Sequence, residues 1–189
     1  MALVVLLRGV NVGGHRTFRP AILAKQLADL DAVNIGAAGT FVIRQPVTQA
    51  RLRAELARKL PFQAEIMICR GRDMLGLMSQ RHFAGQPVRP DIVRFVSVLS
   101  RNPRSAPSPP VSLPASGRWL LKVLARERRF VFGVYRRQMK AIGYLGEIDR
   151  LFGVPATTRN WNTITAIAKV LADKPMQRTA FGRRGEAGR

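Results

Sequence analysis

Three short segments of the sequence place polar side chains beside glycines or at an expected helix start, two settings that bind anions. The first is the glycine loop, residues 9–16, which follows the apolar run 3–7 and contains three glycines. Glycine permits positive φ and close approach of a ligand, and successive backbone N–H groups beside arginines suit an anion. The alternative is a connection whose glycines serve backbone geometry alone.

The other two segments are residues 36–40 and residues 156–163, the Thr/Asn segment. Two glycines in the former predict a tight turn between two strands. The latter leads into a predicted helix, with Thr157 and Thr158 as expected N-caps. Free N–H groups, the positive end of the helix dipole and Arg159 would converge there on an anion. The alternative is that these side chains only cap the helix and pack it on the core.

We expect the glycine loop and the Thr/Asn segment to meet in one cleft that binds a phosphate-bearing ligand. The expected anion ligands are Arg8, Asn11, Gly13, Gly14, His15, Thr158, Arg159, Asn160 and Asn162. No catalytic residue is assigned, because the chain has no nucleophile elbow, P-loop or dinucleotide-binding pattern. Two distant histidines and one cysteine make a poor metal set, so neither a metal nor a cofactor is expected. One of these histidines, His82, is expected to be solvated.

The charge balance points to an anionic partner. The 189 residues include 32 Lys or Arg against 11 Asp or Glu, a net charge of +21 that is spread over both halves of the chain. Such a chain attracts nucleic acid or nucleotides, unless the arginine excess is only compositional. Apolar stretches too short for a membrane span, no signal-peptide pattern and a single cysteine favour the cytoplasm, with no membrane partner. The lone Cys69 is expected to be buried.

Hydrophobic periodicity predicts six elements before residue 70, in the order β-α-β-β-α-β. They are strand 2–7, helix 20–30, strands 33–37 and 39–44, a helix from the cap Thr48 to Leu60, and strand 64–69. This order is the ferredoxin-like pattern, with the first strand in the middle of an antiparallel sheet and two helices on one face. A further helix, 72–80, would lead out of this first subdomain, residues 1–85.

A second, smaller α+β subdomain is expected over residues 91–173, after a junction at 86–90. Its predicted elements are strand 91–100, an extended proline-rich loop 102–116, a hairpin 119–125 with 129–135, and helices 138–152 and 160–172. Gly153 is the expected stop of the first of these helices. Residues 174–189 are rich in Gly and Arg and are expected to form a disordered basic tail.

The blocks 6–14 and 156–163 together resemble the bacterial domain-of-unknown-function family number 1697. The resemblance extends to about Leu171, and it implies an α+β protein whose first part is ferredoxin-like. It supplies no activity. Members usually carry Ser-Gly-Asn where this chain has Ala38-Gly39-Thr40, and often Ser-Lys-Leu where it has Met139-Lys140-Ala141. Each departure removes a hydroxyl, so this chain would lack any catalytic role that relatives give to the turn serine.

Three functions follow as hypotheses. The leading one is a cytoplasmic binding protein for a phosphate-bearing ligand, a nucleic acid or a nucleotide. The second is an enzyme that acts on a small anionic substrate in a cleft between residues 9–16 and 157–162. The third is a structural scaffold in which both segments serve folding only. The sequence sets no oligomeric state.

Overall fold

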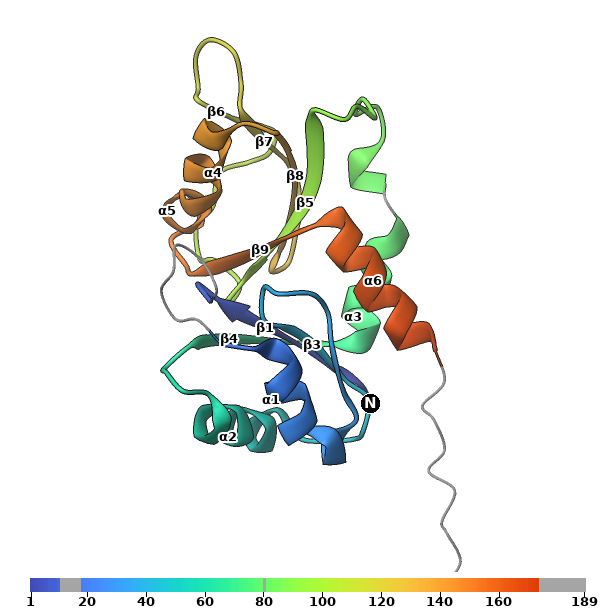
Figure 1. The fold of residues 1–189 in the computed structure, drawn as a ribbon. Helices are drawn as coiled ribbons and strands as arrows, with labels where there is room; N and C mark the ends of the chain where they lie inside the picture. Colours follow the sequence, from blue (N-terminus) through green and yellow to red (C-terminus); the bar gives the residue numbers. More distant parts are fainter. Residues whose placement is uncertain (11–17, 80, 174–189) are drawn as a thin grey trace, which may run out of the picture.

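The protein has an α+β fold with two antiparallel sheets, as the sequence predicts (Figure 1). A computed structural model describes residues 1–10, 18–79 and 81–173. The first sheet and its helices comprise β1 (Leu3–Arg8), α1 (Pro20–Gln26), β2 (Ala32–Asn34), β3 (Thr40–Ile43), α2 (Gln49–Lys59) and β4 (Glu65–Arg70). The remainder comprises α3 (Gly71–Gly76), β5 (Ile92–Leu99), β6 (Val111–Leu113), β7 (Leu121–Glu127), β8 (Phe130–Arg136), α4 (Met139–Gly146), α5 (Ile148–Phe152), β9 (Ala156–Asn160) and α6 (Trp161–Ala172).

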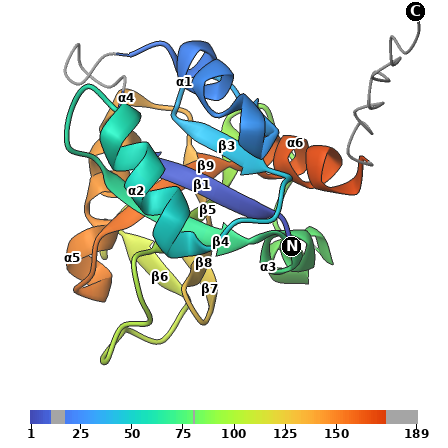
Figure 2. The same ribbon diagram turned by 90° about the horizontal axis from the view of Figure 1, so that it is seen from below.

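The first sheet has the strand order β2-β3-β1-β4, with every neighbouring pair antiparallel. Its elements follow one another as β-α-β-β-α-β, and β1 is a central strand. Both faces of β1 are covered, which explains its unbroken apolar run. Val5 and Leu7 pack in the cluster that includes Leu52 and Leu56 of α2. Figure 2 shows α1 and α2 side by side over this face.

The second sheet has the order β6-β7-β8-β5-β9, and all of its neighbouring strands are antiparallel. Its outer face is covered by α4 and α5 (Figure 1). There Phe95 and Leu121 of the sheet pack with Ile148 and Phe152 of α5. The strand β9 runs from α5 to α6 and lies between the rest of this sheet and β1 (Figure 1).

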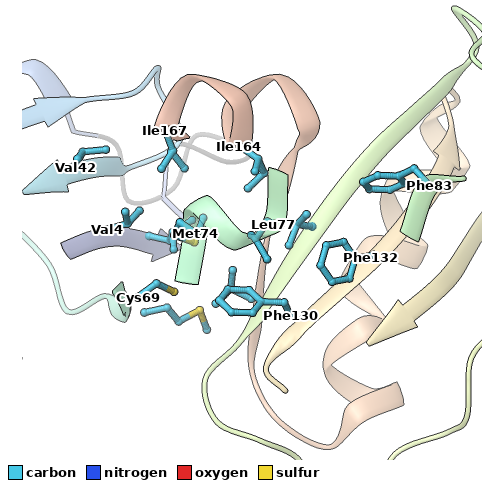
Figure 3. Packing of buried hydrophobic residues seen from close by; sticks show 14 of the residues in the cluster. Val4, Val42, Cys69, Met74, Leu77, Phe83, Phe130, Phe132, Ile164 and Ile167 are labelled. Carbon is cyan, nitrogen blue, oxygen red and sulfur yellow. The ribbon is translucent and has the colours of Figure 1, made fainter. Parts of the chain in front are cut away.

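A central hydrophobic cluster joins the two sheets. Val4 of β1 and Phe132 of β8 belong to it, together with Met74 of α3 and Ile164 and Ile167 of α6. Figure 3 shows these side chains pointing toward one another from the two sheets and the two helices. The sheets therefore share a core, and this shared core holds β9 against the end of β1. The expected division into subdomains at residues 86–90 stays a prediction.

Several segments differ from the sequence prediction. The helix expected over 20–30 ends at Gln26 and is followed by a 3₁₀ turn, Ala28–Leu30. The helix expected over 72–80 ends at Gly76 and continues as a single 3₁₀ turn, and the helix expected over 138–152 divides at Glu147. The loop 102–116 contains the short strand β6. The largest difference is at residues 156–160, which form β9 because they pair with β5, and not a loop before a helix. The tail 174–189 lies outside the described residues.

Other local predictions are confirmed. Thr48 caps α2, because its side chain accepts a hydrogen bond from the N–H of Arg51 at 3.2 Å. Gly153 ends α5 with φ 64°. Cys69 is buried in the shared core, and burial raises the pKa of its thiol to about 11. The thiol therefore keeps its proton at neutral pH and serves as an apolar core atom.

Gly133 allows close packing at the centre of the second sheet and provides a test of it. It pairs with Phe95 across β8 and β5, and a Cβ there would lie 2.3 Å from the Phe95 ring and 2.5 Å from the carbonyl oxygen of Lys122. Gly133→Ala should lower the free energy of unfolding by about 1–3 kcal/mol, because overpacking must displace the ring or the strand. Urea denaturation measures this.

Gly143→Ala is the matched control. Gly143 lies inside α4 with open space around the position of a Cβ. The same substitution there should raise stability by up to about 1 kcal/mol through helix propensity. Equal effects at the two positions would contradict the packing that we describe.

Candidate functional site

The described parts of the glycine loop region and of the Thr/Asn segment lie side by side. The hydroxyl of Thr157 donates to the carbonyl oxygen of Leu7 at 3.4 Å, and Nη2 of Arg159 donates to the same oxygen at 2.9 Å. The end of β1 and the strand β9 therefore meet across about 150 residues of sequence. Convergence of the two blocks is confirmed for these residues.

Arg159 is buried, with 7% of its surface exposed, and all five of its N–H groups are used within the protein. Nε donates to the Thr40 hydroxyl at 2.6 Å, and Nη2 also donates to the carbonyl of Ala38 at 2.7 Å. Nη1 donates to the Thr157 hydroxyl and to the Thr158 carbonyl, each at 2.8 Å. Burial lowers the pKa of Arg159 to about 10, which leaves the guanidinium charged at neutral pH.

The expectation that Arg159 binds an anion is therefore wrong in this arrangement. The reason lies in the strand β9. Residues 157 and 159 share one face of a strand, and here that face is turned toward β1 and the turn after β2. Thr158 is also committed within the protein, because its hydroxyl lies 2.6 Å from the Ser97 hydroxyl across the β5–β9 pair.

The turn at residues 36–39 supplies acceptors to Arg159. Gly39 has φ 65°, and a Cβ there would lie 2.7 Å from Val10 and 2.9 Å from Leu7. Only glycine allows the turn to approach β1 this closely. The approach brings the Ala38 carbonyl and the Thr40 hydroxyl to the guanidinium. The prediction of a tight turn between strands is confirmed.

An open cleft of about 490 Å³, the Arg8 cleft, lies beside this buried network. Nη1 of Arg8 donates to Glu65 at 3.0 Å, and Nη2 donates to Asp149. Asp149 also accepts the N–H of Ala156 at 2.9 Å. Arg8 is thus held between two carboxylates, with 37% of its side chain exposed. Thr157 lines the same cleft.

Sequence reasoning missed Glu65 and Asp149. They lie 57 and 141 residues from Arg8, on β4 and α5, so no local pattern connects them with it. Together they balance the charges of Arg8 and Arg159, and the cleft lining is formally neutral. This neutrality weakens the attraction of the cleft for a phosphate.

Asn160 and Asn162 lie elsewhere. Asn160 caps α6, since its Oδ1 accepts the N–H of Thr163 at 2.9 Å, so the expected caps Thr157 and Thr158 are wrong. Both asparagines line a second pocket of about 210 Å³, the Arg94 pocket. The other expected ligands, namely Asn11, Gly13, Gly14 and His15, lie outside the described residues.

The Arg94 pocket is strongly basic. Arg89, Arg94 and Arg137 line it, and no carboxylate is among its described lining residues. The Arg94 guanidinium lies 5.3 Å from the centre of the Phe83 ring, and Trp161 contacts that ring edge to face at 5.0 Å. Arg89 forms an ion pair with Asp91 at 2.9 Å, just outside the lining.

His82 is half-buried, which overturns the expectation of a solvated side chain. Its ring lies 4.2 Å from that of Phe132, and its Nε2 lies 3.2 Å from Glu127. Burial lowers the pKa of His82. Within the described ranges, no group of three or more His, Cys, Asp or Glu side chains could hold a metal ion. Over the same ranges, no helix has the length and apolar character needed to cross a membrane.

Arg159→Ala tests the structural role of this side chain. The substitution removes the donor to three carbonyls and two hydroxyls, so the free energy of unfolding should fall by about 3 kcal/mol or more. Chemical denaturation measures the loss. The control Arg58→Ala, on the exposed face of α2, should leave the midpoint within error. Unchanged stability of Arg159→Ala would contradict this structural role.

Comparisons with known proteins agree with this fold. A conserved bacterial protein of known structure, SP0830 from Streptococcus pneumoniae, is similar with a TM-score of 0.55 and 14% sequence identity, over 90% of this chain and 98% of that one. A search of curated proteins finds no match. The sequence profile described as "Protein of unknown function (DUF1697)" matches residues 1–117, which contain the first of the two blocks. The chain therefore belongs to the DUF1697 family.

Proposed function

We propose that this protein binds nucleic acid through phosphates that dock at the Arg94 pocket. The observation that carries the proposal is the composition of the pocket lining, which has three arginines and no carboxylate among the described residues. Arg94 and Arg137 form no ion pair among the described side chains, so neither must leave a carboxylate to bind a phosphate. In the Arg8 cleft, by contrast, a phosphate would compete with Glu65 and Asp149 for Arg8.

The size of the pocket favours a chain phosphate over a free nucleotide. Pockets that enclose small molecules usually measure about 300–1,000 Å³. The Arg94 pocket measures about 210 Å³, which suits a phosphate of a strand that lies across the surface. The Trp161 ring and the Asn162 amide are beside it and could contact a base or a sugar. The net charge of +21 would steer the polyanion toward the protein.

Binding of a short single-stranded RNA as a function of salt tests this proposal. Affinity should fall steeply as salt rises, because each phosphate contact releases counterions. Arg137→Ala should flatten the plot of log affinity against log salt by about 0.7, the contribution of one phosphate contact on a single strand. Arg137 is exposed, so its replacement should leave the fold intact.

Arg58→Ala is the control, because it also removes one positive charge but does so on the exposed face of α2, outside the Arg94 pocket. It should leave the slope unchanged. Equal changes in both variants would mean that only net charge matters and would overturn the assignment to the Arg94 pocket. Absence of RNA binding at low salt would overturn nucleic-acid binding altogether.

A second candidate function is an enzyme that acts on a small phosphate ester in the Arg8 cleft. The specific observation is the pair of carboxylates on either side of Arg8 in an open cleft. In this function Arg8 would hold the anionic group, and Glu65 would accept a proton from the attacking water.

Release of 4-nitrophenolate from 4-nitrophenyl phosphate tests the enzyme hypothesis. Glu65→Gln should lower the rate by about 100-fold or more, because the amide cannot accept a proton. Arg137→Ala should leave the rate unchanged, since that side chain lines the other pocket. A rate in Glu65→Gln equal to that of the unsubstituted protein would exclude Glu65 as the base.

A further inference from the structure

A third cavity, the Arg129 pocket, lies at the junction of the two sheets, between α3 and the turn that joins β7 to β8. Its volume is about 670 Å³, within the range of about 300–1,000 Å³ that is usual for small-molecule sites. None of its lining residues belongs to the Arg8 cleft or to the Arg94 pocket. The pocket is thus a separate place at which a ligand could bind.

Arg129 is held rigidly at the wall of this pocket. Its Nε donates to the carbonyl of Leu99 in β5 at 2.9 Å, and its Nη1 donates to the carbonyl of Ile68 in β4 at 3.2 Å. These bonds fix the guanidinium between the two sheets, and they use only two of its five N–H groups. A guanidinium that is already ordered loses less entropy when it binds a ligand.

Arg128 lines the same pocket from the tip of the turn. Its φ of 51° lies in the left-handed region, which residues other than glycine, asparagine and aspartate seldom adopt. The side chain is exposed and forms no ion pair among the described residues. Two adjacent arginines therefore offer donors to one pocket.

The charges of the pocket suit a monoanion. The carboxylate of Glu127 forms an ion pair with Arg81 and also lies near His82. The carboxylate of Asp73 lies 3.7 Å from the guanidinium of Arg72. Three arginines and two carboxylates line the pocket, which gives the lining a formal excess of one positive charge. A doubly charged phosphate would meet stronger repulsion from the two carboxylates than a singly charged carboxylate would.

Part of the wall is apolar. Leu77 and Phe130 line the pocket and belong to the core that the two sheets share, where Figure 3 shows them close together. Both side chains are largely buried, so it is an exposed edge of each that offers hydrocarbon surface beside the two arginines. We propose that the Arg129 pocket binds a small monocarboxylic acid with an apolar body, whose carboxylate pairs with Arg128 and Arg129 while its hydrocarbon part contacts Leu77 and Phe130.

Titration with 2-naphthoate, followed by calorimetry and by thermal unfolding, tests this proposal. The carboxylate should bind and raise the melting temperature, since a ligand of the folded state stabilises it. 2-Naphthol has the same rings without the charge, and inorganic phosphate has charge without the rings. Both should bind at least about 10-fold more weakly, because each lacks one of the two contacts. Equal affinity for 2-naphthol and 2-naphthoate would overturn the role of the arginines.

Arg128→Asn should weaken 2-naphthoate binding by about 10-fold, because it removes one charged pair while asparagine tolerates the positive φ. Arg128→Gly removes the same charge and also suits this backbone, so it replaces the first variant if that one does not fold. Arg58→Ala carries the same loss of net charge on the exposed face of α2, outside the described pockets, and should leave 2-naphthoate binding unchanged. Equal weakening in Arg128→Asn and Arg58→Ala, or no binding by the unsubstituted protein, would overturn the proposal.

Discussion

The arrangement of the two sheets depends on the buried guanidinium of Arg159. This side chain contacts both sheets through hydrogen bonds and forms no ion pair among the described residues. It is positively charged, and its five N–H groups reach acceptors on β1, on the turn before β3, on the first residue of β3 and on β9. A charge removed from water is tolerated only when its hydrogen bonds are satisfied. The end of β1, the turn and β9 must therefore stay in one fixed arrangement.

The opposite side of the sheet junction has its own arginine. Arg129 connects β4 with β5 through two carbonyls, and the central apolar cluster fills the space between the sheets. Apolar packing gives the junction its area, whereas the two arginines fix its register, because hydrogen bonds are directional and hydrophobic contact is not. The Arg8 cleft and the Arg129 pocket are open spaces along this junction.

The three cavities described above differ in charge, and this difference underlies the different ligands that we propose for them. Carboxylates neutralise the Arg8 cleft, the charged residues that line the Arg94 pocket are all arginines, and the Arg129 pocket combines a small positive excess with an apolar wall. A high net charge alone would make all of them equal candidates for an anion. The positions of Glu65, Asp149 and Glu127 distinguish them, so the acidic residues carry more information about function here than the arginines.

The sequence by itself determined the local elements: the apolar run of β1 as a central strand, Thr48 as a cap, Gly153 as a stop and the β-α-β-β-α-β order of the first part. These follow from periodicity and backbone preference, which act over a few residues. It also marked the two polar blocks that meet at Leu7 and Arg159. Only the tertiary structure decided that residues 156–160 form a strand, that Arg159 points inward, and that Glu65 and Asp149 reach Arg8. Strand pairing and burial are long-range choices, made by partners that no local pattern contains.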